Sequence, residues 1–301
     1  MKKSLVAVLC VLVVAACGGS SGNGGQEPPP PPPPSSAIDD FEIALQGLTL
    51  GEFYETSIAT LAQRSPEGLI WRSLQDVYPQ TAVALDNLSD GYRRETFELY
   101  SMALDALRGY DRSILDADGQ LNYDLYEWYL QDTVDRRQFM YHDFPATYGI
   151  FGVPRSTEQL FTEVHPLDSF EDAQRYVARL ALIEAKFQQL EDHLDLQVQR
   201  GIVEPALTMQ VAINQLAPIA TTNGIDNPYY QALAEKTGGH PEISSSQRSA
   251  LLDQVSDTFN NSIRPAYQGL RAKLQSLLSS APAQIGVGQY PDGAAYYDFT
   301  L

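Results

Sequence analysis

Apolar side chains recur every third or fourth residue along most of the chain after residue 38, and this spacing constrains the fold more than any other feature. Such steps place the side chains on one face of an α-helix. No stretch alternates with a period of two for long enough to indicate a β-strand. We therefore predict an all-α body, a multi-helix array of about eight to ten helices. The longest run begins after Ser169 and consists of Phe170, Ala173, Val177, Leu180, Ile183, Phe187, Leu190 and Leu194.

Local signals set the expected ends of these helices. Ser169 and Asp172 resemble a capping box at the start of the longest run, and Gly201 is expected to end it. Pro265 should kink or split a second run, between Leu251 and Leu277. Loops are expected at Ser65–Gly68 and Gly152–Pro154 among other places. Two shorter stripes are also predicted to face the core: Phe97, Tyr100, Leu104 and Leu107, and Leu121, Leu125, Trp128 and Tyr129.

The N-terminus has the pattern of an export signal. Two lysines precede Leu5–Ala16, an apolar run of twelve residues. This run is too short to span a bilayer and fits a signal peptide. Small residues followed by Cys17 resemble a bacterial lipobox. We predict that residues 1–16 are a signal peptide and that Cys17 is the lipid-modified N-terminus of the mature protein; the alternative is an ordinary signal peptide with an incidental cysteine.

A tether is expected to follow the lipid anchor. Residues 18–22 are glycine and serine, and residues 28–34 are a proline run that favours a stiff polyproline II rod. We therefore assign residues 17–37 to the tether and 38–301 to the folded body. Cys10 leaves with the signal peptide and Cys17 carries lipid, so the body is expected to fold without disulfides.

The formal charge of −18 limits the possible partners. So acidic a chain repels phosphate backbones, and we expect no nucleic-acid binding. The charge is interpreted mainly as a source of solubility at a cell surface, with a cationic ligand as the alternative.

Candidate catalytic and metal-binding patterns are few. The four histidines, at positions 142, 165, 193 and 240, lie 23, 28 and 47 residues apart, so none has the spacing of a zinc-protease helix. His193, beside Glu191, Asp192 and Asp195, is interpreted as part of a solvated charge cluster, and His240 as a turn residue.

Other motifs for metal binding, catalysis or phosphate binding are incomplete or absent. Asp116–Gly119 resembles a calcium loop, but Ile114 and Leu125 would occupy its first and last ligand positions. It is interpreted as a polar turn before a helix. No G-x-S-x-G motif is present, and Gly286-Val287-Gly288 lacks the rest of a phosphate-binding loop. The residues themselves therefore predict no catalytic, cofactor-binding or metal-binding side chain.

Several segments, taken in order, resemble the bacterial domain of unknown function family 885 (DUF885). The resemblance covers roughly residues 38–301. The segments that carry it are Leu121–Leu125, Phe144-Pro145, Gly149, Gly152, Phe170–Leu180, Gly201-Ile202-Val203-Glu204-Pro205, Ile263–Tyr267, Gly286 and Tyr290-Pro291-Asp292-Gly293-Ala294-Ala295-Tyr296-Tyr297.

The resemblance implies a helical zinc metallopeptidase. Family members carry an H-E-x-x-x-x-H-like helix well downstream of the P-D-G-x-x-Y-Y segment, and no residue of this chain matches it. Zinc is therefore expected in complete members and no cofactor in this chain. The chain is expected to be the N-terminal half, truncated before the metal-binding helix. Tyr296 and Tyr297 are expected either near a substrate cleft or in the core.

Three functional hypotheses follow. In the first, the chain is an inactive fragment of a metallopeptidase-like lipoprotein. In the second, it is a complete non-catalytic surface module that binds a peptide or protein. In the third, it is an active enzyme whose arrangement of catalytic residues is not recognisable in the sequence. Its expected partners are the lipid bilayer through acylated Cys17, and a peptide substrate or the missing C-terminal half. Gly18 after Cys17 favours the outer membrane of a Gram-negative cell envelope. The DNA beyond codon 301 distinguishes the first two hypotheses.

Overall fold

A computed structural model describes residues 36–147 and 152–301 of the chain. The predicted signal peptide, Cys17, the tether up to residue 35, and Gly149 lie outside these residues. The body that follows forms one compact unit.

The described residues form helices and no strands, so the prediction of an all-α array is confirmed. There are thirteen α-helices in this part of the chain rather than eight to ten, because five of them have fewer than ten residues. The helices are α1 (Ala37–Ala44), α2 (Leu50–Ala62), α3 (Pro66–Trp71), α4 (Asp90–Arg108), α5 (Ala117–Arg136), α6 (Val153–Gln159), α7 (Phe170–Leu180), α8 (Ile183–Gln199), α9 (Ala206–Thr221), α10 (Pro228–Lys236), α11 (Ser245–Thr258), α12 (Arg264–Leu277) and α13 (Gly293–Thr300).

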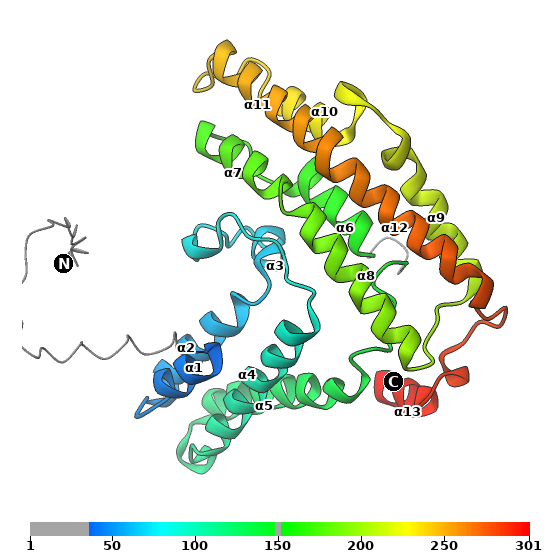
Figure 1. Ribbon diagram of the computed structural model, residues 1–301. Helices are drawn as coiled ribbons and strands as arrows, with labels where there is room; N and C mark the ends of the chain where they lie inside the picture. The colour runs from blue at the N-terminus through cyan, green and yellow to red at the C-terminus, as the bar shows by residue number, and fades with distance from the viewer. Residues whose placement is uncertain (1–35, 148–151) are drawn as a thin grey trace, which may run out of the picture. The chain divides into compact units, whose positions relative to one another are not determined.

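Two hydrophobic cores organise the body. The smaller core is built by α1, α2, α4 and α5 around Phe41, Phe53 and Leu99. The larger core is built mainly by α6 to α12, where α12 packs against α8 and α9 (Figure 1). A third, minor cluster contains Met140, Tyr141, Ile202 and Tyr290.

The longest predicted run forms two helices. The Ser169 hydroxyl accepts a hydrogen bond from the Asp172 amide at 3.0 Å, which confirms the predicted cap of α7. A short turn at Ala181 and Leu182 separates α7 from α8. Gly201 adopts a φ of +74°, a left-handed conformation that favours glycine, and so ends α8 as expected.

The predicted break at Pro265 is also confirmed. Residues Phe259–Ile263 form one π-helical turn between α11 and α12. Proline has no amide hydrogen and clashes with the carbonyl four residues before it. The wider turn accommodates both effects and lets the helix continue.

One predicted core stripe is wrong. On α5, Leu121 and Leu125 are each 57% exposed, and Trp128 is 68% exposed. The buried face of this helix instead carries Tyr123 and Leu130, which pack against the smaller core. Because α5 has apolar residues on both faces, periodicity did not determine which face is buried.

Two predicted loops are helices. Ser65 caps α3 and Gly152 precedes α6, and in both helices proline lies in the first turn. Proline is tolerated there because the amide it lacks would have no partner within the helix. Among the described residues, no helix is long and apolar enough to cross a membrane.

Candidate ligand-binding pocket

One face of α8 is polar and faces the N-terminal part of the body. Lys186, Gln189, His193 and Gln197 follow one another in steps of three or four residues, the spacing of a single helix face. Lys186, His193 and Gln197 are almost fully buried. We call these four residues the polar seam. Each of them bonds to a different part of the chain between residues 67 and 143.

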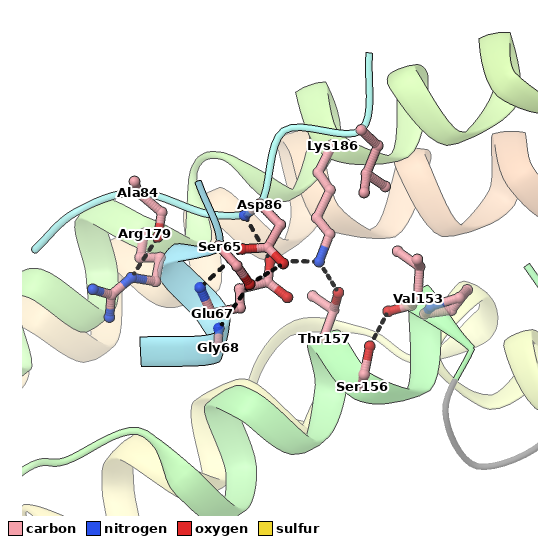
Figure 2. Close-up of polar contacts among 12 residues, drawn as sticks. Ser65, Glu67, Gly68, Ala84, Asp86, Val153, Ser156, Thr157, Arg179 and Lys186 are labelled. Atoms are coloured by element: carbon pink, nitrogen blue, oxygen red, sulfur yellow. Dashed lines mark hydrogen bonds and ion pairs between the residues drawn. The ribbon is translucent and has the colours of Figure 1, made fainter. Parts of the chain in front are cut away.

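At the first end of the polar seam, Lys186 lies among buried acidic and hydroxyl groups (Figure 2). Its ammonium donates to Glu67 on α3 at 2.5 Å and to the Thr157 hydroxyl on α6 at 2.9 Å. Asp86 joins the cluster because it accepts from the Glu67 amide at 3.0 Å and from the Ser65 hydroxyl at 3.1 Å. This end therefore ties α3 and the loop after it to α6 and α8.

Burial dominates the electrostatics of this cluster. Desolvation, reinforced by the negative charge of Glu67, raises the pKa of Asp86 to about 6, and Lys186 only partly opposes the change. Glu67 forms the buried ion pair with Lys186, and the half-buried Asp86 interacts with both charges. Lys186 is therefore the cation that opposes the negative charge of this cluster.

The loop beside this cluster is fixed by Arg179 on α7. Its guanidinium donates to the carbonyls of Ala84, at 3.1 Å, and Ala82. It also contacts Nε2 of His165, whose Nδ1 donates to the Pro166 carbonyl at 2.7 Å. Burial, and then the charge of Arg179, lower the pKa of His165 to about 3, so this ring is neutral at physiological pH.

His193, in the middle of the polar seam, is buried rather than solvated, so the prediction of a solvated charge cluster is wrong. Its ring stacks on Tyr141 at 5.7 Å, and Nδ1 lies 2.7 Å from the Arg93 guanidinium. Burial, and then Arg93, lower the pKa of His193 to about 4. The acidic neighbours Asp192 and Asp195 are exposed because they lie on other faces of α8.

The last part of the polar seam holds the loop that forms a pocket. Gln197 donates to the carbonyls of Tyr141 at 2.7 Å and Asp143 at 2.6 Å, and Arg93 donates to that of Met140 at 2.6 Å. Beside this loop lies a cavity of about 680 Å³, a size that suits a small ligand. It is lined by Arg94, Val134, Asp135, Arg137, Gln138, Met140, Tyr141, His142, Arg200, Ile202, Pro291 and Asp292.

Tyr141 is the centre of the charged side of this pocket. Its hydroxyl contacts Asp90 and accepts from Arg94 at 2.6 Å, and the Arg200 guanidinium lies 3.8 Å from its ring centroid. Burial, and then the bond to Asp90, raise the pKa of Tyr141. The pocket therefore presents arginine side chains next to an un-ionised phenol.

His142 separates this pocket from a second cavity of about 540 Å³. Its Nε2 donates to the Pro291 carbonyl at 2.7 Å, while its buried Nδ1 has no hydrogen-bond partner in the described part of the chain. Tyr296 lines the second cavity, with its ring 5.1 Å from that of His142, whereas Tyr297 is 53% exposed. Of the two tyrosines, Tyr296 is the one at a cavity.

The P-D-G segment reaches the pocket through close backbone packing. A Cβ atom on Gly293 would lie 1.8 Å from the Val287 carbonyl oxygen, so only glycine fits. Asp292 before it has a φ of +56°, the left-handed region. The Tyr290 hydroxyl donates to the Val203 carbonyl at 2.7 Å. Two segments far apart in the sequence, Gly201–Pro205 and Tyr290–Tyr297, thereby meet at one wall.

The histidines do not converge on a metal site. His165 and His193 bond to different arginines, and His240 lies in the turn before α11, as expected. In residues 36–147 and 152–301, no three His, Cys, Asp or Glu side chains form a group that could hold a metal ion. The sequence alone did not predict that Tyr141 and the arginines line a pocket. The signal that could have located the pocket is the pair of family-like segments, Gly201–Pro205 and Tyr290–Tyr297, which meet beside these residues.

This geometry defines the class of protein: an all-helical domain with a charged pocket large enough for a small ligand. The family described as "Bacterial protein of unknown function (DUF885)" matches residues 74–301, and the chain belongs to it. No curated protein matches the chain. The fold is similar to that in "The crystal structure of the putative lipoprotein from Colwellia psychrerythraea", with a TM-score of 0.71 and 16% sequence identity over 82% of this chain. The match spans 45% of that protein's length.

Proposed function

We propose that this chain is an envelope-anchored lipoprotein that forms the N-terminal, peptide-binding part of a metallopeptidase-like protein and does not hydrolyse peptides by itself. The observation that carries the proposal is the pocket at Tyr141 and Arg200. Arg200, Ile202, Pro291 and Asp292, in or beside the segments that carry the family resemblance, form part of its lining. Its mixture of charged and apolar groups suits a short peptide.

The lack of hydrolysis is proposed from the surroundings of the histidines. The Arg179 and Arg93 guanidinium groups contact the rings of His165 and His193, and a fixed positive charge there opposes the binding of a divalent cation. His142 uses Nε2 to bond the Pro291 carbonyl. A catalytic zinc site needs three protein ligands and an open position, and the side chains described here do not fit that requirement.

The test is a binding and cleavage assay of the full-length lipoprotein purified in detergent. A mixed tripeptide library should be retained in equilibrium dialysis and recovered uncleaved. Mass spectrometry of the protein should show no stoichiometric zinc. Stoichiometric zinc with chelator-sensitive hydrolysis would contradict the proposal and would make His142 and His240 the first ligands to mutate.

The lipid anchor is proposed from the lipobox-like residues before Cys17 and from the likeness to a protein described as a lipoprotein. Radiolabelled palmitate should enter the wild type and Cys10→Ala, because Cys10 is removed with the signal peptide. Labelling should be absent in Cys17→Ala, which lacks the acylated thiol. Label that persists in Cys17→Ala would show that the anchor was assigned to the wrong residue. Because Gly18 follows Cys17, the labelled protein should fractionate with the outer membrane.

A second candidate function is the binding of a protein partner, and the exposed apolar face of α5 favours it. Leu121, Leu125 and Trp128 lie on one face of this helix and are each more than half exposed. The two functions use different residues, so Trp128→Ser should weaken partner binding but leave peptide retention unchanged.

A further inference from the structure

We infer that the pocket selects peptides with a free α-carboxylate and that Arg200 is the residue that binds this group. The inference rests on the proposed peptide-binding function and specifies which end of the peptide enters the pocket. It is carried by the way Arg200 is held and by the charges around it.

Arg200 is held in a fixed position at the C-terminus of α8. Its Nη1 donates to the Leu196 carbonyl at 2.9 Å, and its guanidinium carbon lies 3.8 Å from the Tyr141 ring centroid. Tyr141 is itself fixed by Asp90 and Arg94. A cation held against an aromatic ring loses little further freedom when it binds a ligand.

The unused edge of this guanidinium matches a carboxylate. Among the described residues, neither Nε nor Nη2 of Arg200 makes a hydrogen bond, while Nη1 is occupied. Nε and Nη2 lie on one side of the planar group and donate in parallel. Two parallel donors are the geometry that arginine uses to bind the two oxygens of a carboxylate.

Among the described residues, Arg200 is the arginine of the pocket without a carboxylate at ion-pair distance, and Asp90 interacts with its charge from farther away. Arg94 pairs with Asp90 at 2.7 Å, and Arg137 pairs with Glu98. In the described part of the chain, Arg200 makes no ion pair. A single anionic group is therefore attracted to Arg200 in preference to the other two.

The rest of the lining argues for a peptide end rather than a polyanion. Asp135 and Asp292 also line the pocket and would repel a ligand with several negative charges, such as a nucleotide. Val134, which is half-buried, offers apolar surface for a side chain beside the buried Met140 and Ile202. One carboxylate beside an apolar side chain is the chemistry of a peptide C-terminus.

The experiment compares two tripeptide libraries that differ only at the C-terminus, one of free acids and one of amides. Equilibrium dialysis against the full-length lipoprotein in detergent, with mass spectrometry of the retained peptides, gives their relative retention. The free acids should be retained about tenfold more strongly than the amides, as expected for a charge-assisted pair of hydrogen bonds. Arg200→Gln should remove this difference.

Arg72→Gln is the matched control. Arg72 is likewise exposed, follows the last residue of a helix and donates Nη1 to a carbonyl four residues earlier, at 2.8 Å, but it lies outside the pocket. The Arg72→Gln variant should therefore keep the wild-type preference for free acids over amides. Equal retention of acids and amides by the wild type, or a preference that survives Arg200→Gln, would overturn the inference alone. Retention of neither library would overturn the proposed function as well.

Discussion

Lys186→Met should lower the free energy of unfolding by about 3 to 5 kcal/mol, because it leaves buried carboxyl groups without their cation. Lys186 is 3% exposed and bonds to Glu67, which is 6% exposed, while Asp86 lies beside them. Methionine has a similar volume, so the loss comes from charge and hydrogen bonds rather than from a cavity. Urea unfolding followed by circular dichroism measures it.

Two further variants separate this explanation from a general effect of removing a lysine. Lys273→Met breaks the exposed ion pair with Asp195 and should cost less than about 1 kcal/mol. Combining Lys186→Met with Glu67→Gln should recover part of the loss, because fewer buried charges then lack a partner. A loss from Lys186→Met no larger than that from Lys273→Met would show that the buried pair does not stabilise the fold.

Glu204→Gln should change how stability depends on pH. Glu204 is 7% exposed, and its Oε2 is buried without a hydrogen-bond partner in the described part of the chain. Burial raises its pKa from 4.5 to about 8, while the Thr208 hydroxyl acts in the opposite direction. Because the folded-state pKa is the higher one, the group stabilises the fold below pH 4.5, and that stability is lost as the pH rises towards 8.

The stability of Glu204→Gln relative to the wild type should therefore rise by roughly 3 kcal/mol between pH 5 and pH 8, since one pKa unit corresponds to about 1.4 kcal/mol. Thermal unfolding at both pH values measures the change. Glu235→Gln, on the exposed side of α10, is the control and should show no such trend. A relative stability that is constant between the two pH values would mean that Glu204 is solvated or paired in the native protein.

The parts of the fold that could be predicted are those determined by local physics. The apolar face of α7 and α8, the Ser169 cap and the break at Pro265 each depend on residues close together in the sequence. The buried face of α5 could not be determined in this way. Trp128 and Tyr123 are both large and partly apolar, and only packing against the smaller core determines that Tyr123 is buried.

The candidate pocket could not be predicted because its residues are separated by long stretches of chain. Arg94, Tyr141 and Arg200 come from α4, a loop and the end of α8. The polar residues of the seam have the composition of an exposed helix face, so His193 and Lys186 are indistinguishable from solvated residues in the sequence alone. Their burial follows from partners such as Arg93 and Glu67, which only the tertiary structure supplies.

The polar seam has a consequence for how the body opens. The denaturant dependence of an unfolding step scales with the surface that the step exposes. Parting α8 from Glu67, Leu88 and Arg93 breaks directional bonds and also removes Ile70 and Leu85 from the larger core. Such a partial opening therefore exposes part of the larger core, and urea should favour it while the smaller core stays folded. Native-state hydrogen exchange at several urea concentrations would detect it as a sub-global event below the global unfolding transition.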